Sequence, residues 1–483
     1  MKKQSFIYGA TVLAVASILC KILSAALKIP LDRLFLHEEG IAVYQSAYSV
    51  YNVFLAICVT GIPIALSSLV AGKDDSEASS FAASTFMVVT IFSVASAIVL
   101  FACAAPLARL LSGGGESVAA LSLRVLCPAL LVMGVISSRR GYFQGRENMT
   151  PSAMSQLAES VLKVALGIGI CAVAVKGGIA TGSAGALCGV TAGAMASALV
   201  LEVFFRRSHP LKGKVSFQKG IAVIKMSIPM TLGAFGFTAV MLVDTLTVPS
   251  LLAQGGTDAL ERLKMFGYLT RANTVYNLPA TIITAFTASA VPALAIARGD
   301  KKLLGENAVK AVKLIFLAAF PCGLGMIFFS REIIELLYSS ASYSALLALA
   351  GVMVFIMPYV QTTTAMLQTV GKVWSPIAVS GCAVLVKAVL NFLLIKHLGI
   401  YGAPIATVLA FIPAMIINTR MLSKKVELFG IGKELLKLLL YAVVACGLAR
   451  ALYIVTGGTI MLLVSVCVAI IIYLCFIIVS EKD

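Results

Sequence analysis

Long runs of apolar residues alternate with short polar segments along the whole chain. About 20 consecutive apolar residues form a helix long enough to cross the hydrocarbon core of a bilayer. A transmembrane β-barrel would instead show short segments of alternating hydrophobicity. The pattern therefore predicts an all-α polytopic membrane protein with fourteen helices, near residues 5–28, 41–70, 79–104, 117–138, 151–175, 181–205, 221–249, 268–297, 311–329, 345–369, 376–396, 401–420, 438–455 and 459–479.

Composition supports this class and argues against several kinds of chemistry. Hydrophobic residues make up 60% of the chain and charged residues 12%, against about 25% charged in soluble domains. The first apolar segment lacks a small-residue cleavage site, so we expect a retained helix rather than a signal peptide. There is no Walker A, HExxH or CxxC pattern, so we expect no ATP hydrolysis, no metal and no other cofactor, and a protein that is not an enzyme.

The net charge of +17 is explained by topology better than by a nucleic-acid partner. Basic residues concentrate in the predicted loops on one side of the membrane, which is typical of the cytoplasmic side. With both termini in the cytoplasm, these loops carry Lys2, Lys3, Lys73, Arg139, Arg140, Arg146, Arg206, Arg207, Lys212, Lys214, Lys219, Arg298, Lys301, Lys302, Lys310, Lys372, Arg420, Lys424, Lys425, Lys433, Lys437 and Lys482. We therefore expect a multi-pass protein with cytoplasmic ends that binds no nucleic acid.

An internal repeat divides the chain. Residues at offsets of 224–225 match: Gln144, Pro151, Ser155 and Lys163 return as Gln368, Pro376, Ser380 and Lys387, and Val50-Tyr51-Asn52 returns as Val275-Tyr276-Asn277. The offset spans six helices, an even number, so the halves share one orientation about an axis along the membrane normal. We predict two pseudo-twofold related six-helix lobes, 1–210 and 211–422, and two further helices in 423–483.

Ionisable residues inside predicted spans mark candidate sites, because charge at membrane depth usually faces a cavity or a partner. Ser17, Lys21, Ser24 and Lys28 share one face of the first helix. Lys28 alternatively snorkels to the membrane surface. In the fifth helix Glu159 and Lys163 are spaced i,i+4, so they either neutralise each other or face the cavity.

The other candidates add to a positive cavity. Arg271 lies toward the outer end of helix 268–297, where an interfacial role is the alternative, and Arg33 follows the first helix. The remaining polar candidates in predicted helices are Asp244, Lys387 and Asn391. A cationic cavity concentrates anions, and lysine and arginine are natural phosphate ligands. These residues predict a transporter of an anionic, phosphate-bearing substrate.

The run Arg140-Gly141-Tyr142-Phe143-Gln144-Gly145, continued by Asn148-Met149-Thr150-Pro151, resembles the loop 4–5 signature of the MurJ and stage V sporulation protein B flippases. These flippases belong to the multidrug/oligosaccharidyl-lipid/polysaccharide (MOP) exporter superfamily, whose fold is MATE-like. Lys28-Ile29-Pro30-Leu31-Asp32-Arg33 and Asn277-Leu278-Pro279-Ala280 look closer to the sporulation-type branch. The resemblance covers the whole chain and implies two lobes around a cavity, with the last two helices forming a groove for a lipid tail.

The resemblance also implies a function in polysaccharide or peptidoglycan biosynthesis. A monomer in the bacterial cell membrane would flip lipid II or a related undecaprenyl-pyrophosphate oligosaccharide outward by alternating access. Lys21, Lys28 and Arg271 match the family's pyrophosphate-binding positions, and we add Arg33. Loop 139–150, with Arg139, Arg140, Gln144 and Arg146, would form part of a cytoplasmic gate. The role is either vegetative or specific to sporulation.

Two departures from the family leave coupling open. Helix 2 carries polar residues, among them Gln45 and Ser49, where MurJ-type members have an arginine. Asp244 is kept at the family's sodium site, but Lys387 could replace the cation and pair with Asp244, so ion and membrane-potential coupling both stay open. The alternatives are a multidrug or cation antiporter of the same superfamily, which would need Glu159 or Asp244, and a scaffold that transports nothing.

Overall fold

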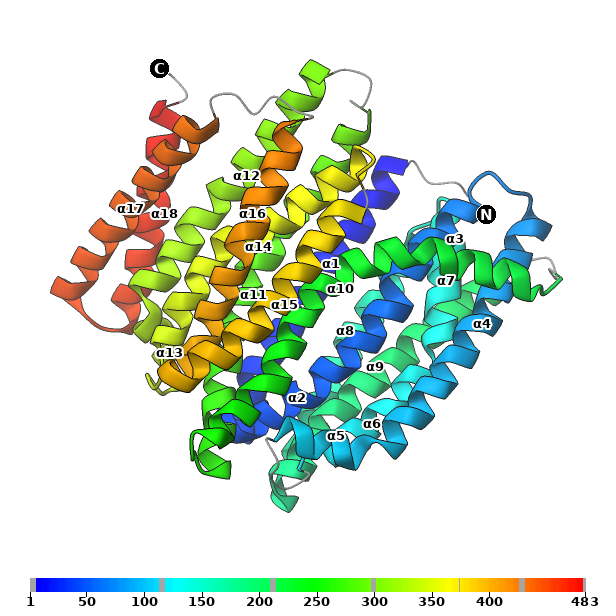
Figure 1. Ribbon diagram of the computed structural model, residues 1–483, viewed down its shortest axis with the longest axis horizontal. Helices are drawn as coiled ribbons and strands as arrows, with labels where there is room; N and C mark the ends of the chain where they lie inside the picture. The colour runs from blue at the N-terminus through cyan, green and yellow to red at the C-terminus, as the bar shows by residue number, and fades with distance from the viewer. Residues whose placement is uncertain are drawn as a thin grey trace. The chain divides into compact units, whose positions relative to one another are not determined.

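The computed structural model describes residues 6–112, 118–208, 214–296, 301–372, 374–424 and 431–480, and helices dominate them (Figure 1). Each of the fourteen predicted helices falls on one or more of the observed ones, so the all-α prediction is confirmed; α5 and α13 are short helices that the hydropathy pattern did not predict. The helices are α1 (Phe6–Leu31), α2 (His37–Leu55), α3 (Ile62–Val70), α4 (Asp75–Ala102), α5 (Ala104–Leu111), α6 (Ala120–Leu131), α7 (Met133–Gly145), α8 (Thr150–Ala174), α9 (Ile179–Arg207), α10 (Phe217–Gln254), α11 (Ala259–Ile296), α12 (Lys301–Phe328), α13 (Ser330–Tyr338), α14 (Ala345–Thr369), α15 (Trp374–Leu398), α16 (Gly402–Ser423), α17 (Ile431–Thr456) and α18 (Thr459–Ser480).

Nine helical runs in the described part of the chain are long and apolar enough to cross a membrane, and ten if α6 and α7, bent by 42°, form one span. Two of these runs, Val15–Val70 and Trp374–Ser423, each join two predicted helices. In the first run, π-helical turns at Asp32–Leu36 and Ala56–Gly61 connect α1, α2 and α3. Helical turns therefore occupy most of the loop expected between residues 28 and 41, but His37, at φ 51° and ψ −168°, leaves the helical conformation and separates α1 and its π-helical turn from α2.

By their internal contacts the residues group into two compact units, Met1–Gly267 and Tyr268–Asp483. The core of the first unit is built from α1 to α10, with Tyr44, Tyr51 and Phe143 among its largest fully buried side chains. In the second unit α12 packs against α14 and α17, α16 packs against α14 and α15, and α17 pairs with α18.

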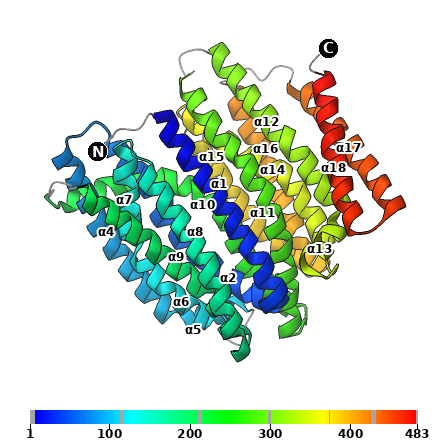
Figure 2. The same ribbon diagram turned by 180° about the vertical axis from the view of Figure 1, so that it is seen from behind.

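Helix α10, which the repeat assigns to the second half, contacts α2, α3 and α4 of the first unit. Its buried positions Gly220, Val223, Ser227 and Thr231 recur every three or four residues and so form one face. Figures 1 and 2 show its first half running across α3 and α4. The contact-defined unit thus extends past the repeat boundary at residue 210, and the division into repeat halves stays a prediction.

Helices α8 and α9 approach each other closely at glycines. A Cβ atom on Gly189 would lie 2.5 Å from Gly167 Cα, and one on Gly193 would lie 2.5 Å from the Glu159 carbonyl oxygen. Small residues allow such backbone contacts between membrane helices. This packing fixes the backbone that carries Glu159 and Lys163.

Replacing Gly193 with valine should therefore push α8 away from α9 and cost about 1–3 kcal/mol through overpacking. The measurement is thermal denaturation of the purified protein in detergent. Gly169→Val is the matched control, since a Cβ atom on Gly169 of α8 meets nothing within 4 Å. Equal melting temperatures for the two variants would contradict the close-packing argument.

Candidate functional site

Lys28 stands in the last turn of α1 and reaches α2. Its ammonium donates to Gln45 Oε1 at 2.8 Å, and Gln45 Nε2 donates to Ser49 Oγ at 2.9 Å. Gln45 and Ser49 lie one turn apart on the same helix face. The side chain of Lys28 is half-buried within the apolar run Val15–Val70. Among the described residues its partners are this amide oxygen and, as described below, an aromatic ring.

Lys163 projects from α8 toward the same two helices. Its ammonium donates to Ser24 Oγ of α1 at 3.1 Å and to the Tyr48 hydroxyl of α2 at 3.4 Å. The residue is only 8% exposed. Of the alternatives for Glu159 and Lys163, mutual pairing is not what the structure shows, because Glu159 pairs with Arg140 instead.

The ring of Tyr48 joins the two lysines. Lys28 Nζ lies 5.8 Å from the ring centroid and Lys163 Nζ lies 5.2 Å from it. Both distances are within the range in which an aromatic face attracts a cation. Tyr44 stacks on Tyr48 with centroids 5.7 Å apart. We call Ser24, Lys28, Gln45, Tyr48 and Lys163 the lysine–tyrosine cluster.

Tyr48 was not among the predicted site residues, although the spacing of the tyrosines in α2 could have indicated it. Tyr44, Tyr48 and Tyr51 recur at spacings of four and three, and so lie on one face of α2. Tyr48 was not predicted because site residues were sought mainly among charged side chains, and a row of aromatic residues on one helix face usually packs in the core. Tyr44 and Tyr51 are indeed buried, whereas Tyr48 is half-buried beside the two ammonium groups.

Arg140 forms a separate buried network. It is 7% exposed and donates to Ser155 Oγ at 3.2 Å, Ser197 Oγ at 2.9 Å and Glu159 Oε2 at 3.0 Å. The network ties α7 to α8 and α9. Because the guanidinium is neutralised by a carboxylate and bonded to hydroxyls, its burial in a membrane span is compensated.

The gate loop expected at 139–150 is wrong in its secondary structure. Helix α7 continues to Gly145, so Arg139, Arg140 and Gln144 are helical and only the turn from Arg146 to Met149 separates α7 from α8. The helix persists because its glycines allow close contact with α3: a Cβ atom on Gly145 would lie 2.7 Å from the Ser67 carbonyl oxygen.

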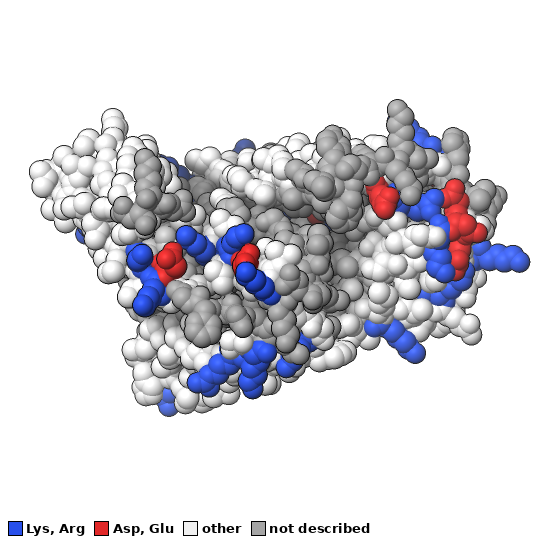
Figure 3. All heavy atoms as spheres, turned by 90° about the horizontal axis from the view of Figure 1, so that it is seen from above, with Lys and Arg blue, Asp and Glu red and all other residues white. Residues whose placement is uncertain are grey.

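The arginines flanking this segment are also paired. Arg139 bonds Glu202 of α9 at 3.1 Å, and its guanidinium lies 3.6 Å from the ring centroid of Phe205. Arg146 pairs with Asp75 and donates to the Lys73 carbonyl oxygen at 2.8 Å. Figure 3 shows one face of the molecule, on which several Lys and Arg side chains lie beside Asp or Glu. Their charges are thus partly neutralised by neighbours that the sequence did not reveal.

The remaining predicted site residues are distributed as follows. The side chain of Lys21 lies outside the described residues, although the neighbouring Ser17 donates to Gln156 Oε1 of α8 at 2.8 Å. Arg33 is exposed in the π-helical turn after α1, and Asp244 is buried in α10.

In the second unit Arg271 is 3% exposed, with its guanidinium 5.3 Å from the ring centroid of Tyr268 and 5.0 Å from that of Tyr338. Lys387 and Asn391 are both fully buried in α15, and Lys387 Nζ donates to Thr407 Oγ1 of α16 at 2.5 Å. The pairing of Lys387 with Asp244 stays a prediction.

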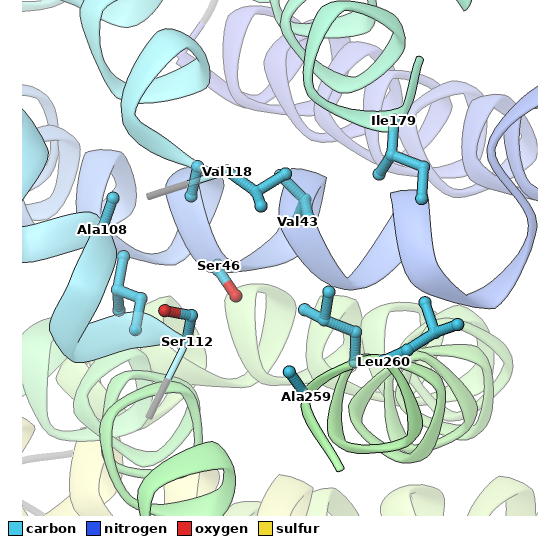
Figure 4. Close-up of a pocket in the computed structure, with 11 residues that line it drawn as sticks. Val43, Ser46, Ala108, Ser112, Val118, Ile179, Ala259 and Leu260 are labelled. Atoms are coloured by element: carbon cyan, nitrogen blue, oxygen red, sulfur yellow. The ribbon is translucent and has the colours of Figure 1, made fainter. Parts of the chain in front are cut away.

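A separate pocket of about 230 Å³ opens between α2, α5, α9 and α11. Figure 4 shows Val43, Ile179 and Leu260 among its lining, and no charged residue belongs to that lining. Ser46 and Ser112 supply the polar side chains. A pocket of this composition suits an apolar group, so we assign the candidate anion site to the lysine–tyrosine cluster instead.

The comparisons agree on one kind of protein. Residues 6–297 match the family model described as polysaccharide biosynthesis protein. Three proteins of Bacillus subtilis (strain 168) are similar over most of their length. Stage V sporulation protein B is 28% identical over 446 residues, covering 88% of this chain and 85% of that protein. For lipid II flippase MurJ the values are 24% over 449 residues, 86% and 82%, and for the uncharacterized membrane protein YabM 25% over 437 residues, 88% and 81%.

Solved structures extend the likeness to the fold. The inward closed conformation of the lipid II flippase MurJ aligns with a TM-score of 0.76 at 15% identity, covering 98% of this chain and 99% of that one. An inward-facing MATE family multidrug resistance transporter of the MOP superfamily aligns at 0.69 with 17% identity, covering 84% and 95%. The predicted MATE-like fold is therefore confirmed, and the chain is a multi-pass membrane protein.

Proposed function

Because the chain belongs to the polysaccharide biosynthesis protein family, we propose that it flips an oligosaccharide linked to undecaprenyl pyrophosphate, such as lipid II, across the bacterial cell membrane by alternating access. Relatives named stage V sporulation protein B and lipid II flippase MurJ support this substrate class. In this proposal the N- and C-termini lie in the cytoplasm, and the polar head group crosses the membrane beside basic side chains.

The observation that carries the proposal is the position of Lys28. Its ammonium lies within an apolar run, and among the described residues its partners are a neutral amide oxygen and an aromatic ring, with no carboxylate. A cation at membrane depth that no acid neutralises attracts an anionic group. Arg271, buried beside the rings of Tyr268 and Tyr338 in the second unit, is a further basic residue that we propose as a ligand of the pyrophosphate.

A drug or cation antiporter is the alternative within the same superfamily, and the MATE transporters share the fold. A cationic drug requires a carboxylate that is available to bind it. Glu159, one of the two expected acids, is engaged by Arg140 at 3.0 Å. This pairing favours the anionic substrate over the cationic one.

Depletion of the protein in its native cell tests the proposal. We expect one undecaprenyl-pyrophosphate-linked precursor to accumulate on the inner leaflet. The measurement labels the lipids that are accessible from outside intact cells, then extracts all lipids and compares the labelled and unlabelled precursor. Susceptibility to cationic drugs should stay unchanged. Increased drug susceptibility with normal precursor levels would overturn the flippase and support the antiporter, and unchanged values of both would support a scaffold.

A further inference from the structure

Lys163 is a buried ammonium that the proposed function has not yet used. We infer that Lys163 and Lys28 together form a two-cation site for the phosphates of the substrate, and that Lys163 gives the site its preference for pyrophosphate-linked over monophosphate-linked lipids. This inference rests on the proposed function, since it specifies which phosphate-bearing lipid the same site takes.

The first step is the environment of Lys163. The residue is 8% exposed within the apolar run Thr150–Gly177, and its hydrogen-bond partners are the hydroxyls of Ser24 and Tyr48. The nearby carboxylate on its own helix, Glu159, forms its salt bridge with Arg140. Among the described residues no carboxylate pairs with the Lys163 ammonium. A buried charge without a counter-charge is unfavourable in a membrane, so an anion that reaches this ammonium is bound strongly.

The second step is convergence. Lys163 arrives from α8 and Lys28 from α1, yet both ammonium groups lie within 6 Å of the Tyr48 ring centroid, at 5.2 Å and 5.8 Å. The two ammonium groups are therefore no farther apart than the sum of these distances. Like charges at such a separation repel, and more strongly in an apolar environment than in water. An anion placed between them removes the repulsion and gains attraction from both.

The third step is preorganisation. The backbone of Lys163 is fixed by α9, because a Cβ atom on Gly189 would lie 2.6 Å from the Lys163 carbonyl oxygen. Its ammonium is held by Ser24 and Tyr48, while Gln45 holds that of Lys28 at 2.8 Å. A site ordered before binding loses less side-chain freedom when the ligand arrives.

The fourth step is the charge count. A sugar linked to a lipid through pyrophosphate carries two negative charges, one on each phosphate, whereas a sugar linked through a single phosphate carries one. The two ammonium groups beside the Tyr48 ring match the two negative charges of the pyrophosphate-linked lipid. With Lys28 alone the site would bind both lipids through one charge-assisted contact.

The test measures binding of two probes that differ by one phosphate, undecaprenyl pyrophosphate–glucose and undecaprenyl phosphate–glucose, to the full chain in nanodiscs. Wild-type protein should bind the pyrophosphate probe more tightly. Lys163→Met should weaken that binding about 10- to 100-fold, as expected for loss of a charged hydrogen bond, and change binding of the monophosphate probe less than about threefold. Lys163→Arg should retain most of the preference.

Two controls separate binding from folding. Lys176→Met removes an exposed lysine beyond the end of the same helix and should leave both affinities unchanged. The melting temperature of Lys163→Met should equal or exceed that of wild type, because replacing a buried charge with an apolar side chain is often neutral or stabilising.

The outcomes distinguish failure of the proposed function from failure of the inference about Lys163. If wild-type protein binds neither probe, the proposed function fails and the inference fails with it. If it prefers the pyrophosphate probe and Lys163→Met keeps that preference, the inference is overturned while the proposed function stands. Equal weakening toward both probes would also overturn it, because Lys163 would then not distinguish the number of phosphates.

Discussion

Replacing Glu159 with leucine should destabilise the protein by about 3–5 kcal/mol, the usual effect of leaving a buried charge without its partner. The charge left behind is the guanidinium of Arg140, whose side chain is 8% exposed. Among the described residues, only the hydroxyls of Ser155 and Ser197 would remain as its hydrogen-bond partners. Thermal denaturation in detergent, followed by light scattering or intrinsic fluorescence, measures the loss.

The double variant Arg140→Met, Glu159→Leu supplies the decisive comparison. Removing both charges should restore most of the stability, since buried ion pairs are replaced by apolar residues at little or no cost. Glu77→Leu is the surface control. Glu77 pairs with Lys73 at 2.8 Å, but both side chains are about two-fifths exposed, so its loss should cost less than about 1 kcal/mol. A double variant no more stable than Glu159→Leu would show that the network acts through packing and not through charge.

Replacing Lys28 with methionine should reduce transport at least about tenfold without unfolding the protein. Methionine has nearly the length of lysine, and an apolar side chain is well tolerated in a membrane span. The lost contact is a charge-assisted one to phosphate, worth about 1.5–3 kcal/mol. The measurement is the rate at which a fluorescent lipid-linked oligosaccharide becomes accessible on the opposite face of proteoliposomes.

Lys28→Arg should keep much of the transport rate, because it preserves the charge and the donor. Lys73→Met, which removes a surface lysine, should behave like wild type. Normal transport by Lys28→Met would contradict the role of Lys28 in binding phosphate, on which the proposed function depends.

The fold could be predicted from the sequence because a helix that crosses the bilayer needs about 20 apolar residues in a row, and such runs stand out between short polar segments. Every predicted helix falls on an observed one, whereas the equivalence of Lys163 and Lys387 in the repeat stays a prediction. The junctions were predicted less well. Between residues 28 and 41 a π-helical turn follows α1 where polar residues indicated a loop, and only His37 departs from helical geometry. Buried Asp32 was read as part of that loop, because a single sequence does not show where a polar side chain finds its partner.

The site could be predicted only in part, for a related reason. The position of Lys28 on a polar helix face is a local property, and it was recognised. The roles of Arg140 and Lys163 depend on partners far away in the sequence. Glu159 lies 19 residues from Arg140, and Ser24 lies 139 residues from Lys163. Spacing within one helix left open whether Glu159 and Lys163 pair with each other, and tertiary packing gives each of them other partners.

The twin lysines of the repeat have different surroundings. Lys163 reaches across to hydroxyls on α1 and α2, whereas Lys387 donates to Thr407 on the next helix, α16. If the predicted repeat reflects a gene duplication, both copies keep the lysine while its hydrogen-bond partners differ. A role inferred for Lys163 therefore does not carry over to Lys387, and each lysine needs its own test.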